Sequence, residues 1–409
     1  MSAAADQPLT FIQGGGVVDP VRGAVDPGAG LLVEAGRIIA VGTAGNVRPA
    51  GAVTVDVGDA VLVPGFVDAH THVTIRPGEG DQHQQLQAAP AWQAVRGVAN
   101  LRRMLGSGVT TARIMTEEHD IDFEFRAAIE RGEVAGPRLR VAGRGLSPPG
   151  RHGSGPAGVS GPADLRAAVR RIADKGADHI KIFTTGGVSS TGTALTDSNY
   201  SGEEISAVVA EAAAAGLTVA AHAHGGAGVD LAVANGVRSI EHGALLTEQN
   251  VRAIADSGAW LVLTTTILFH PAGIEAGDAR EPAILAKVRA ARAAMERTAE
   301  LVRAAGIRVA LGTDSMHGLF GHELQWLVEH GWSPAEALTA ATLHGAMVAG
   351  TGDAGAFVPG RRADVVALGR DPLDDITAVF DVRAVFSAGH QVVDARGYCR
   401  PRPVTADPD

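Results

Sequence analysis

The chain has 409 residues, of which 45% are hydrophobic and 20% are charged, and this composition is typical of a folded globular protein rather than a disordered or membrane-embedded one. Its formal net charge of -10 argues against nucleic acid or an anionic membrane as a partner, because both require a positively charged surface. The single cysteine, Cys399, excludes an intramolecular disulfide and a metal site built from several thiolates.

The first residues, MSAAADQPLTFIQGGG, lack the basic and apolar regions of a secretory signal. No run of about 18 apolar residues, the length that spans a membrane, follows them. We therefore expect a cytoplasmic protein that acts on a small molecule. The sequence is compatible with a homo-oligomer but carries no signal that specifies one.

Both ends of the chain have the pattern of short β-strands separated by Gly, Asp and Pro turns. In the first part, residues 1–63, the predicted strands are Leu9–Gln13, Gly30–Ala35, Arg37–Val41 and Val53–Val57. Residues 351–409 show the same pattern. We expect the two parts to form one small β-sandwich domain.

Between residues 64 and 350, short apolar runs alternate with Ala-rich helical stretches, which is the pattern of a parallel sheet with crossover helices. Eight such runs occur, the number that closes a (β/α)₈ TIM barrel. They are Gly65–His70, Val109–Ile114, Arg138–Ala142, His179–Phe183, Thr218–His222, Ser239–His242, Trp260–Thr264 and Arg308–Gly312. The clearest helices between and after them are Ala163–Lys175, Gly202–Ala215 and Pro334–Ala349.

The interval between the last two predicted strands is unusually long. It contains LFHPAGIEAGD and then a charged, Ala-rich helix over Arg280–Ala305. We interpret it as a loop and a helix over the mouth of the barrel, and whether residues 265–280 act as a lid stays open.

The first chemical signal is VPGFVDAHTHV, which ends the first barrel strand. Side chains alternate along a strand, so Asp68, His70 and His72 share one face that can point into the barrel. Two imidazoles spaced i, i+2 at the C-terminal end of a strand can chelate one cation.

Three further strand ends carry potential ligands: His222 and His224 in AAHAHG, His242 in SIEHG, and Asp314 in GTDS. These are hard or borderline donors of the kind that divalent metals bind. The alternative interpretation, histidines buried in the core and bonded to the backbone, would need four independent coincidences.

Lys181 lies in the fourth predicted strand, with Ile180 and Ile182 on the opposite face. An ammonium group in a buried strand is costly unless it is paired or neutralised. Either Lys181 forms an ion pair with an acid inside the barrel, or its neutral amine has reacted with CO₂ to give a carbamate that bridges two metals.

The motifs VPGFVDAHTH, IKIFTTGGV, VAAHAHG, SIEHG and LGTDS, in this order, resemble the amidohydrolase superfamily in its binuclear form with a carboxylated lysine. The resemblance is strongest to the branch that includes Xaa-Pro dipeptidases, ochratoxin-hydrolysing amidases, and molinate and phenylurea hydrolases. It covers nearly the whole chain, including LLVEAGRIIAVG and GAFVPGRRADVVALGRDPL at its two ends.

The resemblance implies two divalent metal ions. His70, His72 and Asp314 would bind one, His222 and His242 the other, and Lys181 carboxylated by CO₂ would bind both, with a hydroxide bridging them. The donors suit zinc, and manganese, cobalt or iron would also bind. Asp314 would act as general base and then general acid.

The chain also departs from that branch. Where relatives have an Arg-Asp-Leu-Gly-Gly segment and a Gly-Gly-His-Gly element, it reads ARIMTEEHDIDF and PPGRHGSG, so His152 is a candidate substrate-facing residue with altered neighbours. His224 stands where many relatives have tyrosine. It either donates to the substrate carbonyl, which we favour, or supports a metal ligand. Tyr200 is the other candidate catalytic residue, or else a packing residue at a helix start.

We therefore expect hydrolysis of an amide-type C–N bond in an N-acyl amino acid, an Xaa-Pro type dipeptide, an aryl amide, a carbamate or a urea. One alternative is a cyclic-amide or aminoheterocycle hydrolase similar to imidazolonepropionases and deaminases. Another is a non-catalytic scaffold of the same fold. No organic cofactor is expected.

Overall fold

The computed structural model describes residues 9–155, 158–277 and 281–403. No helix within these ranges is both long enough and apolar enough to cross a membrane.

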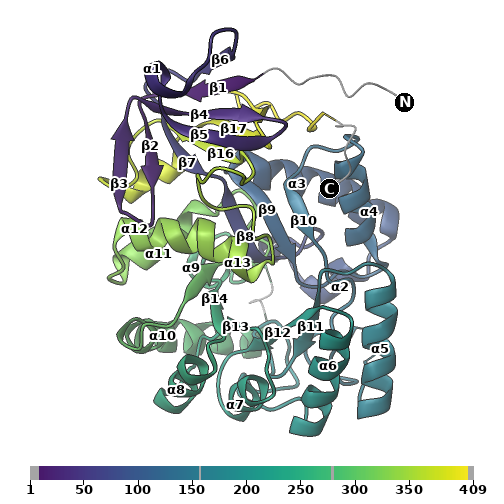
Figure 1. Ribbon diagram of the computed structural model, residues 1–409. Coiled ribbons are helices and arrows are strands. Elements are labelled where there is room, and N and C mark those ends of the chain that lie inside the picture. Colours follow the sequence, from purple (N-terminus) through teal and green to yellow (C-terminus); the bar gives the residue numbers. More distant parts are fainter. Residues whose placement is uncertain (1–8, 156–157, 278–280, 404–409) are drawn as a thin grey trace.

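Eight parallel strands occupy the centre of the chain, each leading towards a helix or loop on the outside (Figure 1). Most of their residues are buried on both faces, which explains why they appear in the sequence as apolar runs rather than as an alternating pattern. The strands are β8 (Phe66–Thr71), β9 (Val109–Ile114), β10 (Arg138–Arg140), β11 (His179–Phe183), β12 (Thr218–Ala223), β13 (Ser239–His242), β14 (Trp260–Leu263) and β15 (Val309–Leu311).

These strands form two parallel sheets, in the orders β10-β9-β8 and β11-β12-β13-β14-β15. Backbone hydrogen bonds join the sheets at both of their facing edges. Beyond β10, Leu146 donates to the carbonyl of Lys181 at 2.8 Å. Beyond β15, the N–H of Asp314 donates to the carbonyl of His70 at 2.9 Å. The C-terminal ends of all eight strands therefore meet around one space.

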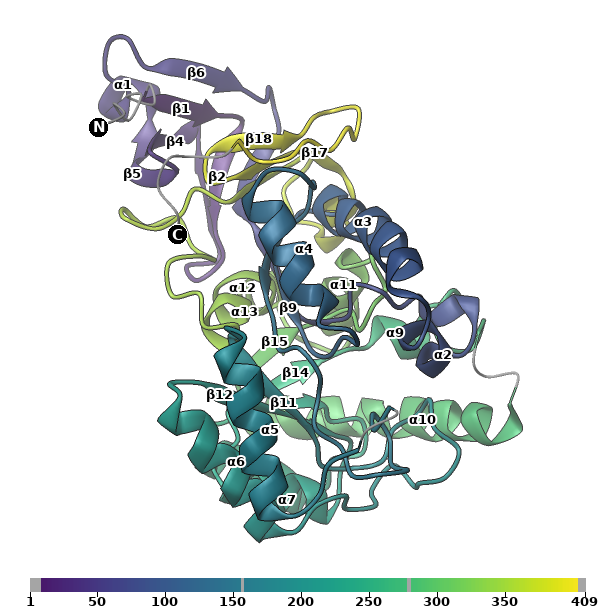
Figure 2. The same ribbon diagram turned by 90° about the vertical axis from the view of Figure 1, so that its right-hand side faces the viewer.

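The helices lie outside the strands (Figures 1 and 2). Their starts follow local rules: Pro282 occupies the first turn of the long helix α10, and Ser201 with Glu204 forms a capping box at the start of α6. The helices are α3 (Pro90–Gly106), α4 (Ile121–Glu130), α5 (Pro162–Asp174), α6 (Gly202–Ala214), α7 (Ala227–Ala234), α8 (Glu248–Ser257), α10 (Pro282–Ala304) and α11 (Gly321–Glu329). The helix expected over Pro334–Ala349 is interrupted, because α12 (Pro334–Thr339) and α13 (Gly345–Val348) flank a π-helical stretch, Ala340–His344.

The two ends of the chain meet in a pair of sheets at the top of Figure 1. One has the order β5-β4-β1-β6 and the other β18-β17-β16-β7-β2-β3. Strand β7 runs antiparallel to β16, so an N-terminal and a C-terminal strand pair directly. Buried side chains from both sheets, such as Leu31 and Phe386, share one hydrophobic cluster.

The strands of these sheets are β1 (Thr10–Gln13), β2 (Gly16–Asp19), β3 (Ala24–Pro27), β4 (Ala29–Glu34), β5 (Arg37–Thr43), β6 (Val53–Asp56), β7 (Val61–Pro64), β16 (Val365–Leu368), β17 (Val382–Ser387) and β18 (His390–Val393), with α1 (Ala44–Val47) after β5 and the 3₁₀ helix η4 (Ile376–Phe380) before β17. Strands β2, β3 and β7 were not predicted from the sequence. They are short, and Gly and Pro residues around them had indicated only turns.

Three short helices lie near the C-terminal ends of the strands: η1 (Pro77–Glu79), α2 (Gln82–Leu86) and α9 (Thr266–Phe269). The segment after α9 is tied to α10, because Nη1 of Arg292 lies 2.5 Å from Oε2 of Glu275. Of the segment suggested as a lid, residues 265–280, the last three residues, 278–280, lie outside the described part of the chain.

Candidate metal centre

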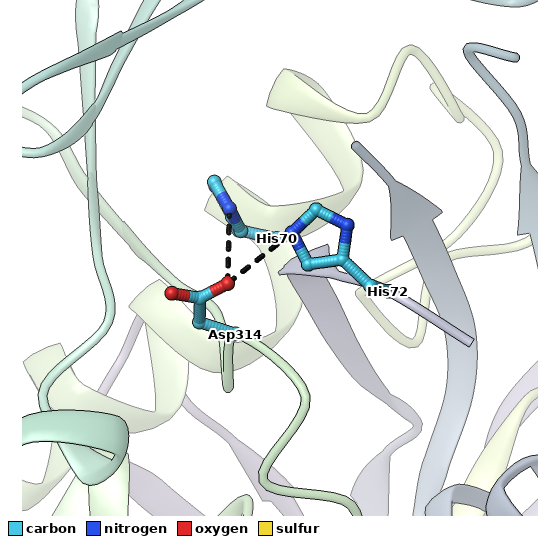
Figure 3. A group of neighbouring side chains, drawn as sticks. All are labelled: His70, His72 and Asp314. Carbon is cyan, nitrogen blue, oxygen red and sulfur yellow. Dashed lines mark ion pairs between the residues drawn. The ribbon is translucent and has the colours of Figure 1, made fainter. Parts of the chain in front are cut away.

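The ends of β8 and β15 bring together His70, His72 and Asp314 (Figure 3). Oδ1 of Asp314 lies 3.5 Å from Nε2 of His70 and 3.3 Å from Nε2 of His72. One donor atom from each residue can be chosen so that all three lie within 4.8 Å of one another. This spacing fits three donors around one cation, as expected from the sequence.

Asp314 has an unusual backbone. Its φ is +47°, and that of Ser315 is +77°, a left-handed conformation that costs a non-glycine residue about 1–2 kcal/mol. The preceding Thr313 donates its N–H and its hydroxyl to Asp68 at 3.0 and 2.6 Å. The N–H of Ser315 donates to Oγ1 of Thr71 at 3.2 Å. These bonds hold the turn that presents the Asp314 carboxylate to the two histidines.

His70 is held by a buried ion pair. Its Nδ1 lies 2.8 Å from Oε2 of Glu241, whose Oε1 lies 3.1 Å from Nη1 of Arg113. The Ser239 hydroxyl donates to the same Oε1 of Glu241 at 2.5 Å. Burial would raise the pKa of Glu241, but Arg113 and His70 hold it well below its usual range. A charged carboxylate beside Nδ1 keeps the imidazole proton on Nδ1, so the lone pair that could bind a metal is on Nε2.

His72 and His222 are each fixed by a backbone carbonyl. Nδ1 of His72 donates to the carbonyl of Thr116 at 2.8 Å, and Nε2 of His222 donates to that of Gly186 at 3.1 Å. A neutral imidazole that donates from one nitrogen carries a lone pair on the other. In the neutral form, the lone pair is therefore on Nε2 of His72 and on Nδ1 of His222.

His242 connects the two groups of predicted ligands. Its ring centroid lies 4.5 Å from that of His70 and 4.6 Å from that of His222. Its Nδ1 lies 2.8 Å from the hydroxyl oxygen of Thr264. Burial lowers the pKa of His222 and His242 well below the ordinary value, so both rings are neutral, as metal ligands must be.

Lys181 is almost completely buried, with 1% of its surface exposed. Within the described part of the chain its Nζ has no hydrogen-bond partner, although the Phe183 ring centroid lies 5.2 Å away. Burial lowers the pKa of this amine to about 8. An ammonium group without a partner is unfavourable here, so this lysine loses its proton more readily than an exposed one does.

All six predicted ligands line one cavity, together with His152 and His224. Nδ1 of each of these two histidines is buried and, among the residues that the structure describes, without a hydrogen-bond partner. Tyr200 does not line this cavity. Its hydroxyl donates to the carbonyl of Val159 at 2.7 Å, and the side chain packs in the core, which corresponds to the packing role considered from the sequence.

The sequence analysis missed several buried charged residues around the site. Glu241 and Arg113 are the clearest, and Glu117 and Glu323 are fully buried acids whose carboxylates accept hydrogen bonds from the loops after β8 and β14. Burial raises the pKa of Glu117 and of Glu323 to about 7. A charged residue inside an apolar run, as in ARIM and SIEH, was the available signal.

Comparison with known proteins places these features in context. The amidohydrolase family model matches residues 61–392. Ochratoxinase from Aspergillus niger is 30% identical over 360 residues, which cover 80% of this chain and 73% of that protein. Imidazolonepropionase from Cereibacter sphaeroides is 27% identical over 382 residues, which cover 83% of this chain and 88% of that protein. A solved prolidase structure with bound N-methylphosphonate-L-proline is 31% identical, has a TM-score of 0.85, and covers 94% of this chain and 99% of that one.

Proposed function

Because this chain belongs to the amidohydrolase family, whose structures have a TIM-barrel type of fold, and is a hydrolase that acts on C–N bonds, we propose that it cleaves an acyclic amide-type bond in a small molecule. The candidates are an N-acyl amino acid, an Xaa-Pro type dipeptide, an aryl amide, a carbamate and a urea. The observation that carries the proposal is the convergence of six donor residues on one cavity that also contains two histidines with unpaired nitrogens.

We propose that the site holds two divalent cations, with zinc the best match to the donors. His70, His72 and Asp314 would hold one, and His222 and His242 the other. When bound, the cations would polarise the substrate carbonyl and lower the pKa of the attacking water.

Lys181 would contact both cations as a carbamate. Its neutral amine adds to CO₂ and loses one proton, so that the product is an anion with two oxygen donors. The depressed pKa of the buried amine favours the neutral form that this addition requires. The absence of a hydrogen-bond partner for Nζ among the described residues supports this assignment over an ion pair.

Asp314 would move the proton. Its carboxylate takes a proton from water and delivers it to the departing nitrogen, because an amide anion is a very poor leaving group. His224 would donate a hydrogen bond to the oxygen that becomes negative, and its unpaired Nδ1 fits this role. His152 would also contact the substrate, since it lines the same cavity and its ring centroid lies 4.6 Å from that of His222.

A second candidate is hydrolysis of a cyclic amide or an aminoheterocycle, which the similarity to imidazolonepropionase favours. That chemistry does not require a lysine among the ligands, so the buried and unpartnered Lys181 weighs against it. The non-catalytic scaffold is set aside, because the family and its hydrolytic relatives identify this chain as an enzyme.

The test is turnover by metal-analysed protein of a panel containing each acyclic class and one cyclic amide, with release of the amine measured. We expect at least one acyclic substrate to be hydrolysed and Asp314→Asn to abolish that activity while the fold is retained. Hydrolysis of the cyclic amide alone would favour the second candidate.

A further inference from the structure

Away from the proposed ligands, eight apolar side chains form one part of the pocket wall, beside nine polar ones. They come from the loop after β8, from α2, from the end of β11 and the loop that follows, and from α9, the segment after it and α10. These residues are Ile75, Leu86, Phe183, Val188, Ile267, Leu268, Ile274 and Met295. All except Leu86 are buried. A substrate group that fills this space is removed from water, which favours an apolar group.

Only one residue of the pocket wall carries a formal charge outside the proposed ligand set, among the lining residues that the structure describes. It is Glu118, in the loop after β9, and its side chain is 15% exposed. Oε1 of Glu118 lies 3.4 Å from Nε of Arg144, and this arginine lines a different pocket. The wall therefore offers a substrate an anion and no cation.

The polar groove that continues from the pocket also has more acidic than basic side chains in its described lining. It shares His83 and His152 with the pocket, and its described lining includes three acids, Glu79, Asp81 and Glu281. Glu79 is paired with two arginines outside the groove. The one cation in this described lining, Arg151, has 42% of its side chain exposed to solvent. The groove therefore offers a negatively charged substrate little electrostatic attraction on its way to the pocket.

We propose that the substrate is a neutral amide, carbamate or urea with an apolar substituent, rather than a dipeptide or N-acyl amino acid with a free carboxylate. This inference rests on the proposed C–N hydrolysis and narrows its substrate class. A carboxylate that leaves water for the part of the wall away from the proposed metal centre would find Glu118 and uncharged groups there, and burial of an anion without a cationic partner is unfavourable.

The experiment compares matched pairs that differ only in the carboxylate. The pairs are an N-acyl-proline with the N-acyl-pyrrolidine, an N-acyl-phenylalanine with the N-acyl-phenethylamine, and an aryl carbamate with and without a ring carboxylate. We expect kcat/KM to be at least about 10-fold higher for the neutral member of each pair that is turned over. Equal or better turnover of the carboxylated members would overturn this inference and leave the proposed function intact. No turnover of any pair by metal-loaded, folded protein would overturn both.

A substitution at Glu118 tests the cause of the preference. In Glu118→Gln, the ratio of kcat/KM for the carboxylated member to that for the neutral member should rise by about 3- to 10-fold, because a like charge is removed. The matched control is Glu296→Gln, an exposed acid on α10, which should leave the ratio unchanged. A ratio that is unchanged in Glu118→Gln, or that changes equally in both variants, would contradict the assignment of Glu118.

Discussion

Nδ1 of His70 lies 2.8 Å from Oε2 of Glu241, and neither side chain is more than 1% exposed. The carboxylate is in turn paired with Arg113, which is also fully buried. The orientation of one predicted ligand therefore depends on an ion pair outside the described lining of the pocket, formed by residues of two other strands, β9 and β13.

We expect Glu241→Gln to weaken divalent metal binding by about 10- to 100-fold, because an uncharged acceptor fixes the His70 tautomer less strongly. The measurement is metal retained after dialysis against a graded series of chelator concentrations. The exposed Glu248 supplies the control variant Glu248→Gln, which should retain metal as the unchanged protein does. Equal metal retention in both variants would show that Glu241 serves only the packing of the strands.

The protein as isolated in active form should contain close to two divalent ions per chain, because six donor residues exceed the four positions of a tetrahedral zinc site. Elemental analysis beside a protein determination gives the number. One ion per chain, with no gain in activity on addition of metal, would instead support a mononuclear site.

His224→Ala should lower kcat by about 10²-fold or more if the imidazole donates to the developing negative oxygen. The metal content should stay nearly unchanged, which separates this role from that of a ligand. Loss of metal in parallel with activity would assign His224 to metal binding instead.

Lys181→Ala should lose most of its activity and metal, since the proposed bridging anion is removed. Short carboxylic acids added together with metal should restore part of the activity, because they can occupy the vacated space next to the site. The exposed Lys175 provides the control, and Lys175→Ala should be active and insensitive to these acids. A Lys181→Ala protein with two metals and near-full activity would rule out the carbamate.

The sequence alone predicted the candidate site where the residues of a single strand determine which side chains share a face. Alternation along β8 placed His70 and His72 on one face, whereas their grouping with Asp314, which the structure shows, was implied by the family resemblance. That resemblance is confirmed by the family match over residues 61–392. Partners from distant strands were not predictable in this way. The pairing of Glu241 with Arg113 depends on how β13 and β9 face each other across the interior.

Short elements were also missed for physical reasons. Strand β7 has only four residues, and its identity comes from its partner β16 rather than from its own pattern. The hydroxyl of Tyr200 was considered for catalysis, yet the carbonyl of Val159, far from it in sequence, accepts its hydrogen bond. Neither pairing is encoded by residues that are close along the chain.

The pairing of β7 with β16 has a consequence for how the protein matures during synthesis. Val61 is opposite Leu368, so β7 emerges from the ribosome long before its partner has been made. Strand β8, which carries His70, follows β7 by a single residue. One edge of β7 pairs with β2, which is made earlier, but its other edge is paired only after β16 has been made, and contacts between such distant segments form slowly. Stable acquisition of metal in the cell should therefore follow the synthesis of β16 rather than that of β8.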